Sequence, residues 1–423
     1  MHQVQLAASR VVQQVLANGR NLNQVLEQAL HGEGLETAQR AALQDLSYGT
    51  LRFYGQLQMM LEQLLHKPPS DQKVRYLMLV ALYQLQYGKS AQYAVVDNAV
   101  RASQKLNPRL ASLINAVLRN FLRRREELLN KAAQQPETNY SYPRWWVDEL
   151  KSQYGTSGTT ILDEGNRHPP MTLRVNRRLT SAEAYLKLLH QQDIAASLIE
   201  PGAIQLQRPL PVNKLPGFLE GMVSVQDAGA QYAARLLDVK EGMNVLDVCA
   251  APGGKAAHIL ELTPVDLLAI DKDELRLKRV RENLDRLKLT AKIRCGDAAS
   301  PETWWDGRPF QRILADVPCS ASGVVRRHPD IKWLRRREDI AKFSQQQLVI
   351  LRAMWRLLAH DGKLLYATCS VFAQENEQVV TAFLREYPDA CRMQICLPDN
   401  SKGQLLPNEQ HDGFFYALLH KAA

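Results

Sequence analysis

The sequence has few cysteines and no pattern that would tie them together. Its six cysteines form no Cys-x-x-Cys pair and no cluster with histidine. Neither a disulfide framework nor a zinc site is therefore expected. The sequence also lacks internal repeats and low-complexity segments. We expect free thiols in a reducing compartment and no bound metal.

Segments suited to a membrane or to export are absent as well. No run reaches the roughly 18 apolar residues of a membrane span, and Met1–Leu6 lacks the basic and then apolar layout of a secretory signal. With 423 residues, of which 45% are hydrophobic, the chain can fill two or three domain cores. The expectation is a soluble, cytoplasmic, monomeric protein with no membrane partner.

Positive charge is concentrated in the first third of the chain. Residues 1–135 hold 16 basic and 9 acidic residues, and so carry +7 of the total net charge of +9. Such an excess suits binding to a polyanion such as RNA, although a pI near 9.2 also occurs in proteins that bind no nucleic acid. Four arginines late in this region could contact phosphates or form a solvated helix face: Arg119, Arg123, Arg124 and Arg125.

Changes in periodicity divide the sequence into three expected domains. Apolar residues three and four positions apart predict that residues 1–135 are all helical. In residues 136–222, an alternating strand at Met171–Asn176 precedes a helix that is expected to open with a capping box from Thr180 to Glu183. This middle region is predicted to be a small α/β connecting domain.

The third expected domain, residues 223–423, should enter with a helix near Ser224–Asp227. From residue 240, short apolar segments alternate with helical stretches, which predicts an α/β fold with a doubly wound, mostly parallel sheet. Arg392–Cys396 and Phe414–Leu419 are expected to add an antiparallel edge hairpin. The predicted parallel strands are Asn244–Val248, Leu267–Ile270, Lys292–Cys295, Arg312–Ala315 and Lys363–Ala367.

A segment of small residues follows the first of these strands and opens a helix. Small residues let the backbone approach a ligand closely, and a helix N-terminus offers free N–H groups to a carboxylate. The segment is no phosphate-binding P-loop, because Cys249 stands at its first glycine and Ala256 at its Ser/Thr position. A tight turn without a ligand is the alternative. The segment reads Val248-Cys249-Ala250-Ala251-Pro252-Gly253-Gly254-Lys255.

Acidic residues stand where the next parallel strands end. Asp271 closes the second strand, from where a carboxylate can reach ribose hydroxyls. Asp297 follows the third strand and could accept a hydrogen bond from an exocyclic adenine amine. Each acid alone is more often a turn or cap residue. Three such strand ends in series favour S-adenosylmethionine, whose carboxylate, ribose and adenine they would span.

Two cysteines, Cys319 and Cys369, also follow predicted strand ends of this sheet. The C5 carbon of cytosine is too weak a nucleophile to take a methyl group until a thiolate adds at C6, and an acid/base group must then assist release. The two thiols are candidates for attack and release in either order, and Asp316 could hold the cytosine edge. A lone cysteine is usually a small buried hydrophobe, which is the expectation for Cys249, Cys295, Cys391 and Cys396.

Between these cysteines, Gly323–Arg337 is basic and carries Trp333. We interpret this segment as a site for phosphate neutralisation and base stacking. A solvated helix start near Asp330 is the alternative. Single-stranded or loop RNA would let a target base reach a thiol at low cost.

Taken together, these motifs resemble those of the RNA cytosine-C5 methyltransferases, the family that includes the Sun proteins. The N-terminal third resembles the NusB antitermination factor, and the resemblance covers essentially the whole chain. Two departures are Ala256, where many relatives carry threonine, and Leu418, where lysine is frequent. The matching motifs are CAAPGGK at Cys249–Lys255, DVPCS at Asp316–Ser320, RRHPDIKW at Arg326–Trp333, TCS at Thr368–Ser370 and DGFF at Asp412–Phe415.

The resemblance implies a Rossmann-like class I methyltransferase domain behind a NusB-like RNA-binding domain, and a cytosine of 16S ribosomal RNA as target. It implies contacts with S-adenosylmethionine at residues 248–255, Asp271, Asp297 and Asp316. It also implies that Cys369 is the nucleophile and that Cys319 serves product release, the reverse of the DNA cytosine methyltransferases.

Two other functions compete with this one. Methylation of an adenine or guanine amino group is disfavoured, because such sites often use an Asn-Pro-Pro-aromatic segment where Asp316-Val317-Pro318-Cys319 stands. A non-catalytic RNA-binding or assembly factor would not need both the cofactor motif and the thiols.

Overall fold

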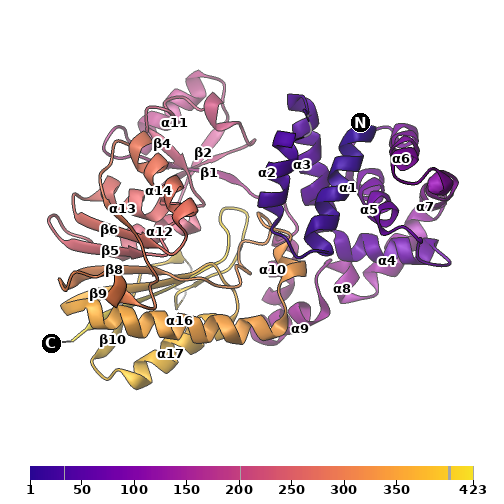
Figure 1. Cartoon of the computed structure of the whole chain (residues 1–423). Coiled ribbons are helices and arrows are strands. Elements are labelled where there is room, and N and C mark those ends of the chain that lie inside the picture. Colours follow the sequence, from indigo (N-terminus) through magenta and orange to yellow (C-terminus); the bar gives the residue numbers. More distant parts are fainter. Residues whose placement is uncertain (33, 201, 399–401, 423) are drawn as a thin grey trace. The chain divides into compact units, whose positions relative to one another are not determined.

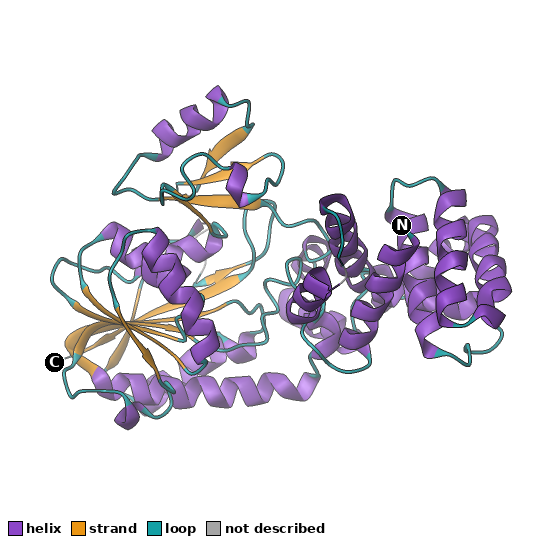
Figure 2. Cartoon of the chain, turned by 45° about the horizontal axis from the view of Figure 1, so that its top comes forward, coloured by secondary structure: helices purple, strands orange, loops and turns teal. Residues whose placement is uncertain are grey.

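A computed structural model describes residues 1–32, 34–200, 202–398 and 402–422. The chain forms two compact units (Figures 1 and 2). The helical unit comprises Met1–Arg167 together with Val325–Arg337, and the sheet unit comprises His168–Val324 together with Glu338–Ala423. A short segment from the C-terminal half of the sequence thus belongs to the N-terminal unit.

The helical unit is built around α5 (Gln72–Tyr87), which is buried along most of its length from Val74 to Leu85. A helix that is apolar on all sides must be enclosed by others, and α5 packs in one core with the helices before and after it. The expectation of an all-helical N-terminal region is confirmed. The surrounding helices are α1 (His2–Leu16), α2 (Leu22–Gly32), α3 (Thr37–Arg52), α4 (Tyr54–Leu64), α6 (Gln92–Leu106), η1 (Pro108–Leu110) and α7 (Ala111–Ala133).

Three further helices extend this unit to Arg167: α8 (Pro136–Asn139), α9 (Arg144–Tyr154) and α10 (Ser157–Glu164). The limits at residues 135 and 222 stay predictions. Of the late arginines, Arg124 pairs with Glu127 and Arg125 donates to Gln86, so both have local partners.

The basic segment that joins the helical unit contains α15 (Ile331–Leu334) and is largely buried. Lys332, fully buried, donates to the carbonyl oxygens of Arg52 and Ser141 at 2.6 and 2.8 Å. Asp330 accepts from the amide of Leu22 at 3.0 Å. The expected RNA contact is therefore wrong for Lys332, because protein carbonyl oxygens already accept its hydrogen bonds. The expected solvated helix start is wrong at Asp330, because this side chain is buried and accepts from the protein backbone.

The sheet unit contains a small antiparallel sheet with strand order β2-β3-β1-β4, and α11 (Ala182–Gln191) lies beside it. The predicted strand is confirmed as β1. The predicted cap is wrong by one residue, because the Ser181 side chain, and not that of Thr180, accepts from the amide of Ala184. The strands are β1 (Met171–Val175), β2 (Ala196–Ile199), β3 (Ala203–Leu206) and β4 (Val223–Val225).

Strand β4 occupies part of the stretch where we expected the third domain to open with a helix. Residues 223–225 pair with β1 in antiparallel register, with Val223 buried and Val225 exposed. The two β-branched valines favour this extended conformation over a helix. The first helix begins only at Tyr232, in α12 (Tyr232–Leu236), after η3 (Gly229–Gln231).

The large sheet has the order β10-β12-β9-β8-β5-β6-β7, and β11 pairs with β12. Five neighbouring strands are parallel, and β12 and β10 complete the sheet in antiparallel orientation. The predicted doubly wound sheet is confirmed, although β10 begins two residues before the expected strand. The strands are β5 (Asn244–Val248), β6 (Asp266–Asp271), β7 (Lys292–Cys295), β8 (Phe310–Asp316), β9 (Leu358–Thr368), β10 (Ala390–Met393), β11 (Gln404–Leu405) and β12 (Phe414–Lys421).

Helices cover both faces of this sheet (Figure 1). Successive residues of a strand point to opposite faces, so Leu314 of β8 packs in the core beneath α12, α13 (Gly254–Leu262) and α14 (Glu274–Arg286). Ile313 packs in the opposite core with α16 (Arg337–Leu357) and α17 (Glu377–Glu386). In the ranges described, no helix is both long and apolar enough to span a bilayer.

Candidate active site at the carboxyl ends of the parallel strands

The parallel register brings most of the predicted site residues to one edge of the sheet. Strand β5 lies between β6 and β8, and β8 lies beside β9. Since ligands of such sheets bind outside the carboxyl ends of the strands, the loop after β5 and the ends of β6 and β8 lie at one edge. Cys369 follows β9 at the same edge.

The two cysteines of the predicted site are in contact. The Sγ atoms of Cys319 and Cys369 lie 3.4 Å apart. Cys319 is 9% exposed and Cys369 is half-buried. The hydrogen bond with Cys369, together with burial, raises the pKa of Cys319 well above its usual value. Cys319 is therefore held as the protonated thiol beside a more accessible partner.

A buried carboxylate, Glu375, joins the two cysteine loops. It accepts from the amide and the hydroxyl of Ser320, at 2.7 and 2.5 Å, and from the hydroxyl of Ser370 at 2.6 Å. These serines directly follow Cys319 and Cys369 in sequence. Burial raises the pKa of Glu375, while its hydrogen bonds oppose that shift. The carboxyl group thus fixes the spacing of the two thiols by holding the serine that follows each cysteine.

Glu375 was missed by the sequence analysis. It lies in the short helix η5 (Ala373–Glu375), six residues beyond Cys369, and Tyr366 donates to its backbone carbonyl at 2.5 Å. The only sequence signal was an acid shortly after a motif that carries a candidate nucleophile.

Lys255 and Asp316 form an ion pair at the same edge, with 2.5 Å between Nζ and Oδ2. Burial alone would lower the pKa of Lys255, but the Asp316 carboxylate more than offsets this and raises it. Lys255 is therefore a fixed cation that links the loop after β5 to the strand end that precedes Cys319.

The loop after β5 approaches its surroundings too closely for ordinary side chains. Gly253 has φ +95°, and a Cβ there would lie 3.1 Å from the Cα of Val280. Cys249 also adopts a positive φ, 58°. The amide of Ala251 donates to Asp271 at 3.1 Å, which ties the loop to the end of β6. Burial raises the pKa of Cys249, so this thiol stays protonated.

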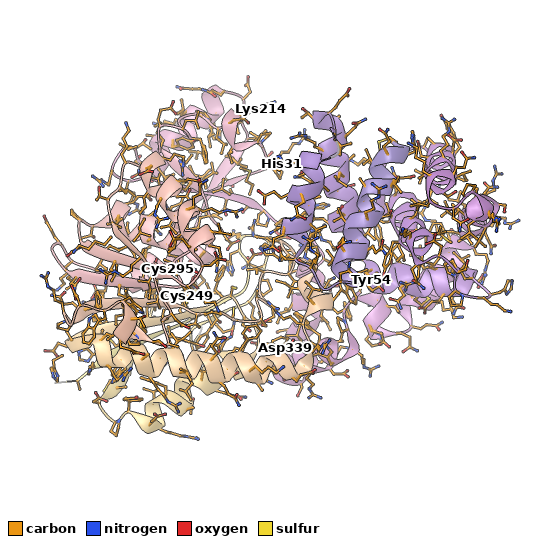
Figure 3. The ribbon with its side chains drawn as sticks, viewed as in Figure 1. His31, Tyr54, Lys214, Cys249, Cys295 and Asp339 are labelled. Carbon is orange, nitrogen blue, oxygen red and sulfur yellow. The ribbon has the colours of Figure 1, made fainter. Side chains whose placement is uncertain are left out.

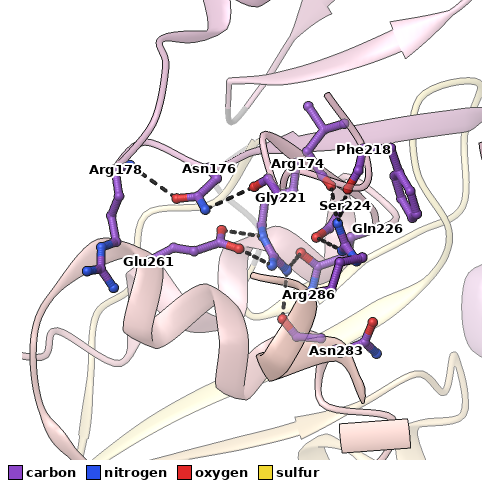
Figure 4. Close-up of polar contacts among 12 residues, drawn as sticks. Arg174, Asn176, Arg178, Phe218, Gly221, Ser224, Gln226, Glu261, Asn283 and Arg286 are labelled. Atoms are coloured by element: carbon purple, nitrogen blue, oxygen red, sulfur yellow. Dashed lines mark hydrogen bonds and ion pairs between the residues drawn. The ribbon is translucent and has the colours of Figure 1, made fainter. Parts of the chain in front are cut away.

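The same loop is anchored to the small sheet by Arg174 of β1 (Figure 4). Its guanidinium donates to the carbonyl oxygen of Gly254 at 2.7 Å and to both carboxylate oxygens of Glu261 at 2.7 and 2.8 Å. The Arg174 and Glu261 side chains are each 2% exposed. The small sheet therefore helps to shape the N-terminus of α13.

The acids around this loop fit the polar groups of S-adenosylmethionine. Asp271 is 2% exposed at the end of β6, and Asp297 is exposed beyond β7, where its side chain accepts from the amide of Ala299. Asp247 of β5, which the sequence analysis did not select, is fully buried, and in the described chain neither carboxylate oxygen has a partner. Burial and the neighbouring Asp316 raise the pKa of Asp247 to about 8. A buried carboxyl group without a partner suits an ammonium group.

Three cysteines that we expected to be small buried residues are instead exposed: Cys295, Cys391 and Cys396. Cys295 ends the edge strand β7 and Cys391 lies in the edge strand β10, where one side of the strand has no neighbour. Figure 3 marks Cys295 and the half-buried Cys249. Across the ranges that the structure covers, three or more His, Cys, Asp or Glu side chains nowhere gather as a metal site would require.

Comparison with known proteins matches three regions of this chain to family models. The 16S rRNA methyltransferase RsmB/F model matches residues 234–420, an RsmF/B-like ferredoxin-like domain matches 142–213, and the NusB family matches 2–123. Ribosomal RNA small subunit methyltransferase B of Yersinia pestis (strain Angola) is 45% identical over 421 residues, 98% of this chain and 97% of that protein. Its Yersinia pseudotuberculosis counterpart (strain IP 31758) matches equally well. The chain belongs to the 16S rRNA methyltransferase RsmB/F family.

Solved structures share the fold of this chain. The crystal structure of PH0851 matches with TM-score 0.80 and 24% identity over 99% of both chains. A methyltransferase homolog protein from Pyrococcus horikoshii matches 67% of this chain and 97% of its own, with TM-score 0.59 and 26% identity. The family models and the curated relatives confirm the resemblance deduced from the motifs, and they confirm the NusB-like and methyltransferase folds of this family member.

Proposed function

We propose that this RsmB/F family member transfers a methyl group from S-adenosylmethionine to C5 of a cytosine in 16S ribosomal RNA, through an adduct between Cys369 and C6. The observation that supports the proposal most directly is the 3.4 Å contact between the two thiols at adjacent strand ends. Thiol addition is needed for methylation at cytosine C5 and not for methylation of an amino group.

The unequal environments of the thiols support distinct roles. Cys369 is more accessible than Cys319 and can attack C6 of a base that is turned out of its RNA strand. After methylation a base removes the C5 proton, the C5–C6 double bond reforms, and the C6–S bond breaks. Cys319, kept protonated, can return a proton to the departing sulfur of Cys369.

Residues at the edge of the sheet would hold the methyl donor, which supplies an electrophilic methyl group when bound. We assign this role to the loop residues Val248–Lys255, to Asp271 and Asp297, and also to Asp247. Asp316 lies between the loop and Cys319, where it can orient Lys255 and accept a hydrogen bond from the cytosine edge.

We propose that the helical unit, which matches the NusB family, contributes to RNA binding. A cytoplasmic location and a monomeric state are part of the same proposal. Methylation of another RNA base, or a role in ribosome assembly without catalysis, would each leave the thiol contact without a purpose.

The test uses methyl-labelled S-adenosylmethionine and unmodified 16S ribosomal RNA, and the product is mapped by bisulfite sequencing. We expect one protected cytosine. Cys369→Ala should abolish turnover and leave RNA affinity unchanged, whereas Cys319→Ala should accumulate a covalent protein–RNA complex. Cys391→Ala, at an exposed thiol on an edge strand, is the matched control. Label on a different base, or a covalent complex formed by Cys369→Ala, would refute the mechanism.

A further inference from the structure

Two arginines of the sheet unit converge on the turn between β2 and β3. Arg177 lies two residues beyond the end of β1, and Arg235 belongs to α12. Both reach Gly202, which has φ +96° in that turn. A Cβ at Gly202 would lie 3.3 Å from Nη2 of Arg235 and 3.4 Å from Nη2 of Arg177. The two guanidinium groups therefore approach a single point from different elements of the fold.

No hydrogen bond or ion pair within the described chain neutralises this pair, although Glu183 attracts Arg177 from a distance. Neither Arg177 nor Arg235 has a hydrogen bond or an ion pair there. Burial lowers the pKa of Arg235, and the nearby positive charge of Arg177 lowers it further. Glu200 attracts Arg235 without forming an ion pair with it. Arg177 is exposed and Arg235 is half-buried, so water screens part of their repulsion, and an anion between the two guanidinium groups would relieve the rest.

We propose that Arg177 and Arg235 bind a phosphate group of the RNA backbone. A guanidinium group presents two parallel donors that match phosphate oxygens, and two such groups can hold one phosphate from two sides. The absence of a side chain at Gly202 leaves the approach to both guanidinium tips open. Arg177, Arg178 and Gly202 line a depression with a volume of about 960 Å³, so a nucleotide can lie next to the arginine pair.

The neighbouring helix N-terminus is not the source of this site. The Ser181 side chain caps α11, and Glu183 carries negative charge in its first turn. The anion is assigned to the arginines alone. Its identity as a backbone phosphate rests on the proposed function, because RNA is the polyanion that this enzyme would have to hold.

The experiment compares Arg177→Gln, Arg235→Gln and Arg385→Gln in the full chain. Arg385 is an exposed arginine of α17, so its replacement removes the same charge at an unrelated place. Binding of a 16S ribosomal RNA transcript is measured over a range of salt concentrations. For each of the first two variants we expect severalfold weaker binding and a salt slope reduced by about one. Arg385→Gln should match the wild type.

Thermal unfolding separates a binding role from a structural one. Because Arg235 has no partner and is repelled by Arg177, Arg235→Gln should leave the Tm unchanged or raise it while RNA binding weakens. A lowered Tm together with normal RNA affinity would overturn the assignment. Equal losses of affinity in all three variants would also overturn it, since the effect would then be one of net charge.

Titration with inorganic phosphate distinguishes the two sources of the same chemical group. Phosphate binding that Arg177→Gln abolishes, combined with an unchanged RNA salt slope, would indicate a free-phosphate site and refute the RNA assignment. The outcome is independent of the proposed reaction. If the arginine variants reduce the RNA salt slope but the wild type methylates no cytosine, the proposed reaction is refuted and the phosphate site stands. If the wild type methylates a cytosine but the variants keep a normal salt slope, the phosphate site is refuted and the reaction stands.

Discussion

Basic side chains in the two units of this molecule differ in whether protein acceptors surround them. In the helical unit, Lys332 is buried and surrounded by carbonyl oxygens. In the sheet unit, Arg177 and Arg235 converge with no partner in the described ranges. The first group belongs to a conspicuous basic run, and the second comes from positions 58 residues apart in the numbered sequence. The number of positive charges in a segment therefore says less about RNA binding than the acceptors that surround each charge.

Two buried acids near the candidate catalytic centre show the same difference between a group with protein partners and a group without them. Glu375 accepts hydrogen bonds from both serines that follow the thiols. Asp247 is as deeply buried and has no partner in the chain as described. We expect the groups that have hydrogen-bond partners within the protein to maintain its structure, and the groups that lack such partners to bind ligands. Four predictions test this difference.

The largest loss of stability is expected for Arg174→Met. The change leaves Glu261 as an unpaired charge in a site where both side chains are 2% exposed, and should cost about 3–5 kcal/mol. Denaturant unfolding measures this cost. Arg352→Met removes a similar two-oxygen contact with Glu386, but at the surface, where the side chains are 43% and 41% exposed, and should cost less than about 1 kcal/mol. Equal costs would show that burial does not decide the role of a basic residue here.

Lys332→Met should cost about 3 kcal/mol, because it leaves buried carbonyl oxygens of Arg52 and Ser141 without their donor. RNA affinity, measured where the variant is still folded, should not change. Lys67→Met, at an exposed lysine of the same unit, is the control. If Lys332→Met weakened RNA binding without lowering the stability, Lys332 would contact RNA as the sequence suggested. The contrast between Lys332 and the arginine pair would then not hold.

The sequence was sufficient for features that local patterns determine. The alternation of apolar segments predicted the parallel strands, and the motifs placed Cys319 and Cys369 at strand ends. The burial of Lys332 was not predictable, because its acceptors at Arg52 and Ser141 lie 280 and 191 residues away in sequence. The same holds for the meeting of Arg177 with Arg235, which depends on three elements packing around one glycine.

Glu375→Gln should lower kcat by about one to two orders of magnitude, because displacing a reacting group by about 1 Å can cost a factor of 100. A glutamine side chain can accept at one oxygen only. It therefore cannot accept both from the Ser320 amide, which donates to Oε1, and from the two serine hydroxyls, which donate to Oε2, so the thiol spacing relaxes. KM for RNA and the free energy of unfolding should change much less. Glu377→Gln, at a partly exposed acid that pairs with Arg392, is the control. If KM rose by as large a factor as kcat fell, or if the variant were strongly destabilised, Glu375 would have a structural role only.

Asp247 should make the stability of the protein depend on pH. Its pKa is about 8 in the folded chain and 3.8 as the ordinary value. Between these values the folded state binds a proton that the unfolded state has released, so raising the pH destabilises the fold, by up to about 1.4 kcal/mol per pH unit. Asp247→Asn should remove this slope, which unfolding curves at pH 5, 6 and 7 can measure. Because an ammonium group would favour the ionised carboxylate, saturating S-adenosylmethionine should flatten the slope in the wild type. A slope that changes with neither the substitution nor the ligand would separate Asp247 from the cofactor site. A buried carboxyl group without a partner would then no longer mark a ligand site.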